Sequence, residues 1–175
     1  MMNELSNQTV FISGSPEDTE KLGARLARAL EQQRFVAFYG TLGAGKTAFI
    51  RGMASVICPA APVQSPTYTI INEYKKDGRT ALVHVDAYRI NDDDDLYSTG
   101  FYDCVEYENC VFAVEWCEKI PFAVPEDAVT VTIEYIFDGT EERIPGGEEN
   151  YLESMELTGS GKRRITVGNL RGRLI

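Results

Sequence analysis

The segment Gly40-Thr41-Leu42-Gly43-Ala44-Gly45-Lys46-Thr47 constrains this chain more than any other part of its sequence. It matches the phosphate-binding pattern G-x-x-x-x-G-K-S/T at every required position. The apolar run from Phe35 to Tyr39 before it is typical of a buried strand, and residues 46–57 after it are typical of a helix. A strand, a glycine-rich loop and a helix in this order predict a Walker A phosphate-binding loop (P-loop).

The residue types of this loop suit phosphate groups. Glycines let the backbone curl so that successive N–H groups face inward, and the positive end of the following helix adds to the attraction. Lys46 is predicted to reach the outer phosphates of a nucleotide. The hydroxyl of Thr47 is predicted to bind Mg²⁺, which offsets phosphate charge during transfer.

A P-loop site also needs a carboxylate at the end of a nearby strand. Asp86 and Glu115 each follow an apolar run, and the unbroken run from Val111 gives Glu115 the clearer Walker B character. The sequence leaves open which of the two acids is the main metal ligand. His84 is interpreted as a packed or hydrogen-bonded side chain rather than a catalytic base. Trp116, directly after Glu115, is interpreted as a core aromatic, with a lid over the site as the alternative.

The remaining patterns predict an α/β, P-loop NTPase-like, three-layer fold with a mixed parallel and antiparallel sheet, in a single P-loop domain of residues 1–175. Asp77-Gly78 predicts a tight turn between two antiparallel strands. The acidic run at residues 92–95 predicts a loop and a helix start. The other predicted elements are a helix over 16–33, strands over 67–74, 80–88, 111–115 and 129–137, a loop over 140–150 and a strand over 151–157.

Composition narrows the function classes. The 27 acidic and 17 basic residues give a formal charge of −10, which argues against tight autonomous binding to nucleic acid. Five basic residues near the C-terminus are interpreted as a solvated segment: Lys162, Arg163, Arg164, Arg171 and Arg173. The four cysteines and the single histidine do not have the spacing of a zinc site. The cysteine thiols are expected to be reduced and packed. Without a leader or a long apolar run, the chain is expected to be cytoplasmic and not membrane-bound.

Four segments together resemble the TsaE (YjeE) family, the ATPase component of the tRNA threonylcarbamoyladenosine machinery. The segments are Gly40-Thr-Leu-Gly-Ala-Gly-Lys-Thr47, Ser65-Pro-Thr-Tyr-Thr-Ile-Ile-Asn-Glu-Tyr74, His84-Val-Asp-Ala-Tyr-Arg89 and Val114-Glu-Trp-Cys-Glu118. The resemblance covers residues 15–120 and includes Leu22-Gly23 in the first helix. Cys117 departs from the proline or small residue that the family shows after its tryptophan.

The resemblance implies an ATPase that binds ATP and Mg²⁺ and acts with TsaB and TsaD. It would then contact tRNA only indirectly, through the complex. Gly43, Ala44, Gly45, Lys46, Thr47 and Ala48 would then bind the phosphates, with Thr47 and Glu115 on Mg²⁺. Lys46 and Asp86 would assist catalysis. Ser65-Pro66-Thr67 would be a phosphate-sensing switch, with Thr67 also at the nucleotide. From the residues alone, this segment is equally interpreted as an ordinary loop whose hydroxyls cap a turn.

Two other classes remain open at this point. A small-molecule kinase would use the same loop and metal, although no arginine-rich lid motif accompanies Arg51 and Arg89. A nucleotide-dependent binding module would use ATP to stabilise one conformation for a partner. A GTPase is disfavoured because the guanine-reading motif Asn-Lys-x-Asp does not occur in the sequence.

Overall fold

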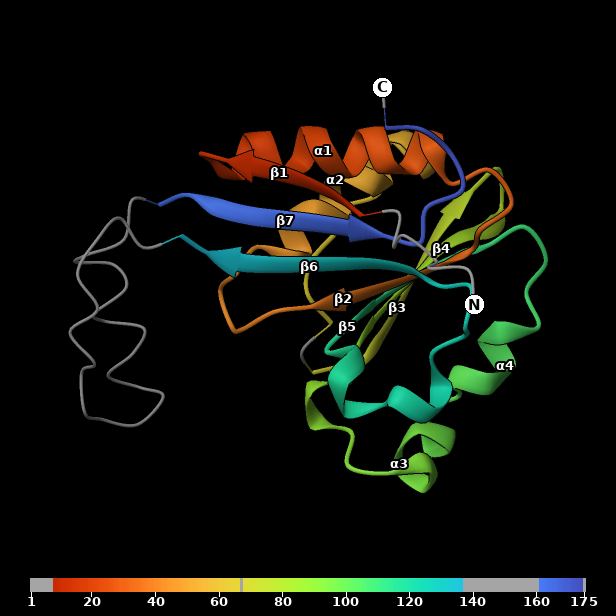
Figure 1. Ribbon diagram of the computed structural model, residues 1–175. Helices are drawn as coiled ribbons and strands as arrows, with labels where there is room; N and C mark the ends of the chain where they lie inside the picture. The colour runs from red at the N-terminus through yellow and green to blue at the C-terminus, as the bar shows by residue number, and fades with distance from the viewer. Residues whose placement is uncertain (1–7, 67, 137–160, 175) are drawn as a thin grey trace, which may run out of the picture.

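The computed structural model describes residues 8–66, 68–136 and 161–174. In this part of the chain, a seven-stranded sheet lies between two layers of helices (Figure 1). Helices α1 and α2 lie on one side of the sheet, and the short helices α3 and α4 lie on the other. This three-layer α/β arrangement confirms the predicted fold class.

The strands are β1 (Thr9–Ser13), β2 (Phe35–Tyr39), β3 (Ile71–Lys76), β4 (Arg79–Asp86), β5 (Val111–Glu115), β6 (Val129–Tyr135) and β7 (Arg163–Gly168). The α-helices are α1 (Pro16–Ala29), α2 (Lys46–Ile57), α3 (Asp93–Ser98) and α4 (Phe101–Val105). Three short 3₁₀ helices complete the described elements: η1 (Ala87–Arg89), η2 (Cys117–Lys119) and η3 (Pro121–Ala123).

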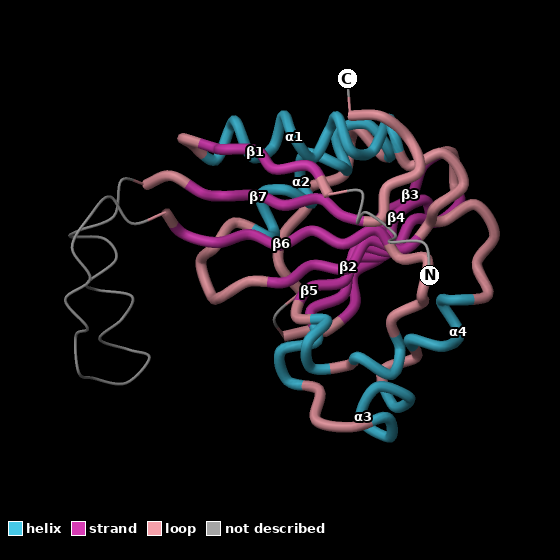
Figure 2. Tube along the Cα trace, viewed as in Figure 1, coloured by secondary structure: helices cyan, strands magenta, loops and turns pink. Residues whose placement is uncertain are grey.

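The sheet has the strand order β1-β7-β6-β2-β5-β4-β3. Its four central strands, β6, β2, β5 and β4, run parallel, whereas β7, β1 and β3 are antiparallel to their neighbours. The sheet is therefore mixed, as predicted. Figure 2 shows the strands in magenta, with helices in cyan on both faces of the sheet. Parallel strands bring their carboxyl ends to one edge, where ligand sites of open α/β sheets form. Tyr39, Asp86 and Glu115 end three of these strands at that edge.

Helices α1 and α2 pack closely because glycines remove side chains from their contact. A Cβ on Gly23 would lie 2.0 Å from the carbonyl oxygen of Phe49, and one on Gly52 would lie 1.9 Å from that of Glu20. The helix pair buries Leu26, among others, against the central strands. This packing fixes the axis of α2, which begins at the P-loop.

Most predicted elements lie where the sequence indicated, with differences at their ends. Strands β2 and β5 and helix α2 have the predicted bounds, β3 and β4 form the predicted hairpin, and Asp92 caps α3 through the N–H of Asp95 at 2.8 Å. Helix α1 ends at Ala29 rather than near residue 33, because Glu31 adopts a positive φ of 50° before the chain enters β2. Strand β3 starts at Ile71 rather than at residue 67, because the N–H of Ile70 closes a turn onto the carbonyl of Pro66 at 2.6 Å.

The end of the chain corrects a prediction. Arg163 and Arg164 start strand β7 between β6 and β1, and Arg163 is half-buried there. The other four basic side chains are exposed, as predicted: Lys162, Arg164, Arg171 and Arg173. Strands β1 and β7 were not predicted, since both are short and lie where polar residues interrupt the apolar pattern. The predicted loop over 140–150 and strand over 151–157 lie outside the described residues.

The four cysteines are all buried and unpaired, which confirms the prediction of packed, reduced thiols. Burial raises the pKa of Cys110 to about 11 and that of Cys117 to about 12, so both thiols stay protonated at neutral pH. None of the described helices has the length and apolar character that a membrane span needs.

Candidate functional site

The P-loop leaves β2 and enters α2 at the carboxyl edge of the parallel strands. Gly40, Gly43 and Gly45 have φ values of 135°, 72° and 112°, which side chains rarely allow. At Gly40 a side chain is also excluded by steric overlap, because a Cβ would lie 2.3 Å from the carbonyl oxygen of Ile133. The glycines of the motif are thus demanded by backbone conformation and by the contact with β6.

Lys46 is folded over its own loop. Its side chain is buried, with 4% of its surface exposed, and Nζ donates hydrogen bonds to the carbonyl oxygens of Gly40 at 2.5 Å and Thr41 at 3.0 Å. Burial lowers the pKa of Lys46, although Glu115, Glu118 and Asp86 each act to raise it. The ammonium is thus surrounded by acceptors and by carboxylates that favour its charged form.

Glu115 lies beside the first turn of α2. The hydroxyl of Thr47 donates to Oε1 of Glu115 at 2.8 Å, and His84 Nε2 lies 2.8 Å from the same oxygen. A carboxylate only accepts, so the His84 tautomer with its proton on Nε2 makes this bond. Nδ1 of His84 is buried and has no hydrogen-bond partner within the described residues. The histidine is packed and hydrogen-bonded, and it holds the carboxylate of Glu115 towards Thr47.

Asp86 ends β4 next to Glu115, its register partner on β5. Oδ1 of Asp86 accepts the N–H of Tyr88 at 3.1 Å, and Oδ2 accepts the hydroxyl of Ser65 at 3.3 Å. The first bond caps η1 and explains why the strand stops at Asp86 and not at residue 88. The second ties the segment before β3 to the carboxylate edge. Thr67 lies outside the described residues.

Trp116 is partly buried against the core and also lies over the lysine. Its ring centroid is 3.8 Å from Lys46 Nζ and 4.9 Å from the ring of Tyr88. Its backbone has a positive φ of 63°, an unusual value for a bulky residue. A turn of this kind directly after β5 lets the half-buried indole project across the loop. The ring thus has features of both interpretations, because it packs against the core and also lies over the P-loop lysine.

Two residues of the C-terminal hairpin also reach the P-loop, and the sequence did not point to them. Arg163 Nε donates to the carbonyl oxygen of Ala44 at 3.2 Å, and its guanidinium lies 3.8 Å from the centroid of Tyr135. A Cβ on Gly43 would lie 2.8 Å from the hydroxyl of Tyr135. For Arg163, the signal in the sequence was its alternation with Ile165 and Val167, which is typical of residues on one face of a strand.

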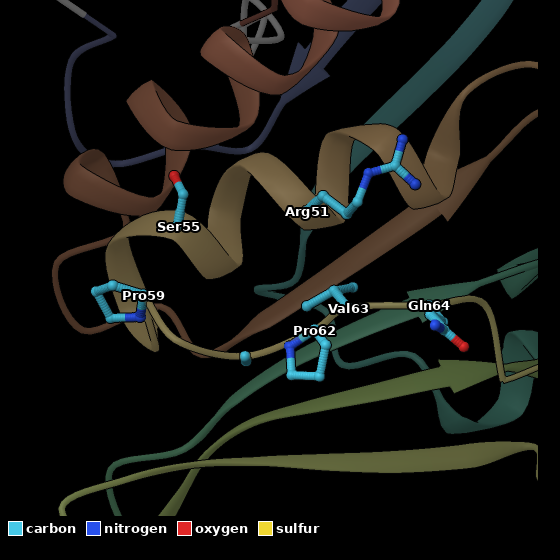
Figure 3. Close-up of a pocket in the computed structure, with 7 residues that line it drawn as sticks. Arg51, Ser55, Pro59, Pro62, Val63 and Gln64 are labelled. Carbon is cyan, nitrogen blue, oxygen red and sulfur yellow. The ribbon is translucent and has the colours of Figure 1, made fainter.

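The oxygen donors fit a magnesium ion held jointly with phosphate. Across the residues that the structure describes, no group of three or more histidine, cysteine or acidic residues is placed to hold a metal alone. Mg²⁺ keeps waters and takes one or two protein ligands with phosphate oxygens, so Thr47 with Glu115 meets its usual need. A separate cavity of about 340 Å³ lies between α2 and the loop before β3. Figure 3 shows residues that line it, among them Arg51, Ser55 and Gln64.

P-loop proteins place a Walker A loop between a central strand and a helix, and the loop between β2 and α2 has this position. Fold and loop together define the chain as an α/β P-loop protein. Comparison with known families adds the particular one: the family described as "Threonylcarbamoyl adenosine biosynthesis protein TsaE" matches residues 13–143. The chain belongs to the TsaE family.

Individual relatives agree with this assignment. The chain is 35% identical over 131 residues to the tRNA threonylcarbamoyladenosine biosynthesis protein TsaE of Treponema pallidum, an alignment that covers 75% of this chain and 95% of the relative. It is 32% identical over 142 residues to the Bacillus subtilis protein of the same name, which covers 81% of this chain and 84% of the relative. A crystal structure of B. subtilis YdiB shares the fold, with a TM-score of 0.63, 22% identity and coverage of 96% of this chain and 89% of that one.

Proposed function

We propose that this chain is the ATP-binding and Mg²⁺-dependent ATP-hydrolysing component of the tRNA N6-threonylcarbamoyladenosine modification machinery. It acts with TsaB and TsaD and supports their turnover. Family membership supports the pathway. The observation that carries the chemistry is the hydrogen bond between Thr47 and Glu115 at the mouth of the P-loop, because it joins the two groups that a nucleotide-bound Mg²⁺ requires.

The proposal assigns the phosphates to the backbone of Gly43, Ala44, Gly45, Lys46, Thr47 and Ala48. Lys46 binds the outer phosphates, and to do so its ammonium exchanges the carbonyl oxygens of Gly40 and Thr41 for phosphate oxygens. The exchange replaces neutral acceptors with charged ones, which form stronger hydrogen bonds. Trp116 lies over the same lysine, with its ring centroid 3.8 Å from Nζ.

Thr47 and Glu115 hold Mg²⁺ in this proposal, and the ion supplies neutralisation of the charge that develops on the phosphate oxygens. Glu115 stays in position because His84 donates to it from the protein interior. Asp86 orients the attacking water or assists its deprotonation. Ser65 and Thr67 belong to a segment that responds to the terminal phosphate, and the bond from Ser65 to Asp86 links that segment to the catalytic carboxylate.

The charge of the chain fits a role in which partners hold the RNA. A formal charge of −10 repels a phosphate backbone, so tRNA is met through TsaB and TsaD. Electrostatic attraction to a basic surface on those partners would also speed association. In this proposal, the protein acts in the cytoplasm.

Phosphate release from ATP and from GTP by the purified chain tests the proposal, measured alone and with TsaB, TsaD and tRNA. We expect ATP-selective release that rises when the partners are present. Lys46→Ala should abolish it, because the variant loses the only side-chain cation proposed to bind the phosphates. Lys21→Ala, which removes a lysine whose side chain is 77% exposed, is the matched control and should leave release unchanged.

Two results would contradict the proposal. Release that ignores TsaB and TsaD would remove the link to the modification machinery. Transfer of phosphate only when a small alcohol or phosphate acceptor is added would instead identify a kinase.

A further inference from the structure

Arg163 and Tyr135 face each other across the antiparallel pair of β7 and β6. Both lie on the sheet face that carries Ile133 and Ile165, which are fully buried beneath α1 and α2. The guanidinium carbon of Arg163 lies 3.8 Å from the centroid of the Tyr135 ring, a distance typical of a cation–π contact. Arg163 Nη1 also donates to the carbonyl oxygen of Gly161 at 2.7 Å, so the side chain is fixed from two sides.

The fixed guanidinium holds one peptide group of the P-loop. Nε of Arg163 donates to the carbonyl oxygen of Ala44 at 3.2 Å. Ala44 is buried, and its carbonyl lies before the helix, whose first hydrogen bond runs from the N–H of Phe49 to the carbonyl of Gly45. A buried carbonyl group needs a hydrogen-bond donor. The helical hydrogen bonds of α2 do not include the Ala44 carbonyl, and Arg163 is the donor to it.

A peptide group is planar and trans, so the carbonyl of Ala44 and the N–H of Gly45 point in opposite directions. Holding the carbonyl towards β7 therefore turns the N–H of Gly45 away from β7. A glycine with a φ of 112° has little intrinsic preference for this orientation, so an external contact can decide it. Tyr135 supports the same stretch from the side, since its hydroxyl lies against Gly43.

We propose that Arg163 is a positioning residue for phosphate binding: by holding the Ala44 carbonyl, it aims the Gly45 N–H at the phosphates of the nucleotide. The inference rests on the proposed function, since it concerns the same nucleotide site. It adds a contribution from β7, which lies beyond the residues 13–143 that the family comparison matches. Tyr135 holds the guanidinium in place through the cation–π contact.

Binding of ADP without Mg²⁺, measured by calorimetry, tests the proposal apart from the metal site. Arg163→Gln should raise the Kd for ADP about tenfold, the size expected for loss of one hydrogen bond to a charged group. Arg163→Lys should recover part of the affinity, because an ammonium can still donate but lacks the planar stacking of a guanidinium. Arg164→Gln removes the same charge from the exposed, opposite face of β7 and should change the Kd less than about twofold.

A second measurement needs no nucleotide. In ¹H–¹⁵N spectra of the ligand-free protein, the Gly45 amide resonance should move in Arg163→Gln and stay in place in Arg164→Gln. The other resonances report whether the variant is folded. An unmoved Gly45 resonance, or equal losses of affinity in both variants, would overturn the inference. Absence of ADP binding by the unaltered, folded chain would instead overturn the proposed function, and the Gly45 resonance would still decide whether Arg163 sets that peptide.

Discussion

At the scale of single residues, the proposed metal site depends on how one carboxylate is shared. Thr47 and His84 both bond to Oε1 of Glu115. Oε2 of Glu115 is therefore the oxygen available to a metal ion or to a metal-bound water. Second-sphere hydrogen bonds of this kind fix the orientation of metal ligands. His84 reaches Glu115 from a fully buried position on β4, so the site is held from the protein core.

Glu115→Gln separates the charge of this residue from its shape. The amide oxygen can still accept the Thr47 hydroxyl, so the fold and ADP binding without Mg²⁺ should be retained. We expect Mg²⁺-dependent phosphate release to fall by at least about 100-fold, as when one group that stabilises transition-state charge is lost. Glu118→Gln is the control, because it removes an exposed carboxylate three residues away that also acts on Lys46. Near-normal hydrolysis by Glu115→Gln would move the metal role to Asp86.

The residues of the candidate site differ in how far the sequence could predict them. Lys46 and Thr47 belong to a contiguous motif, and Asp86 and Glu115 end strands that can be recognised locally. Arg163 lies far along the chain from the P-loop. It reaches the loop because β7 lies only two strands from β2 in the sheet, with β6 between them. That neighbourhood depends on strand order, which a single sequence does not reveal. Their roles in binding and catalysis remain predictions.

At the scale of elements, short range patterns predicted the centre of the sheet better than its edges. Strand β5 is an unbroken apolar run, and β2 leads into a motif, so both were visible. Strand β7 begins with two arginines, and their charge concealed the alternation of Ile165 and Val167. The sequence around β7 is polar, but the strand still forms because one of its faces is buried against α1 while the other remains in water.

The contact between α1 and α2 should be intolerant of even one methyl group. Gly52→Ala would place a Cβ 1.9 Å from the Glu20 carbonyl oxygen, and backbone atoms cannot move as a flexible side chain can. Alanine gains up to about 1 kcal/mol in helix propensity. Overpacking costs about 1–3 kcal/mol and should prevail, so we expect a net loss of stability.

Urea unfolding followed by circular dichroism measures this loss, and Lys21→Ala on the exposed side of α1 is the control. The unfolding midpoint should fall for Gly52→Ala and stay nearly constant for Lys21→Ala. A midpoint for Gly52→Ala equal to or above that of the unaltered chain would show that the helices can separate at little cost. In that case α1 would not fix the position of α2 and its P-loop.

At the scale of the whole molecule, the edge opposite the P-loop is closed by one buried amide. Gln33 lies just before β2, and its Nε2 donates to the carbonyl oxygens of Asp127 at 3.0 Å and Asn169 at 2.8 Å. Its Oε1 accepts the N–H of Arg171 at 2.7 Å. These bonds join the start of β2 to the segments before β6 and after β7. The same side chain therefore fixes the hairpin that carries Arg163 relative to the strand that leads into the P-loop.

Gln33→Ala should lower the free energy of unfolding by about 2–4 kcal/mol. Three hydrogen bonds at about 1 kcal/mol each are lost, together with the packing of the buried side chain. Gln33→Met, which fills the space without the polar atoms, should recover only the packing part of the loss. Gln32→Ala changes the exposed neighbour of the same residue type and should alter stability by less than about 0.5 kcal/mol.

Urea midpoints at constant slope give these differences, because the slope reports the surface exposed on unfolding. If Gln33→Ala and Gln32→Ala unfold at the same urea midpoint, the three hydrogen bonds make no net contribution to stability. In that case they are no stronger than the hydrogen bonds that the same groups form with water in the unfolded chain. The strands of the β6 and β7 hairpin would then be held to β2 by the sheet and its apolar core alone. A large loss in Gln33→Ala would show instead that the hydrogen bonds of Gln33 add to the sheet and the core in holding the β6 and β7 hairpin, which carries Arg163, to β2.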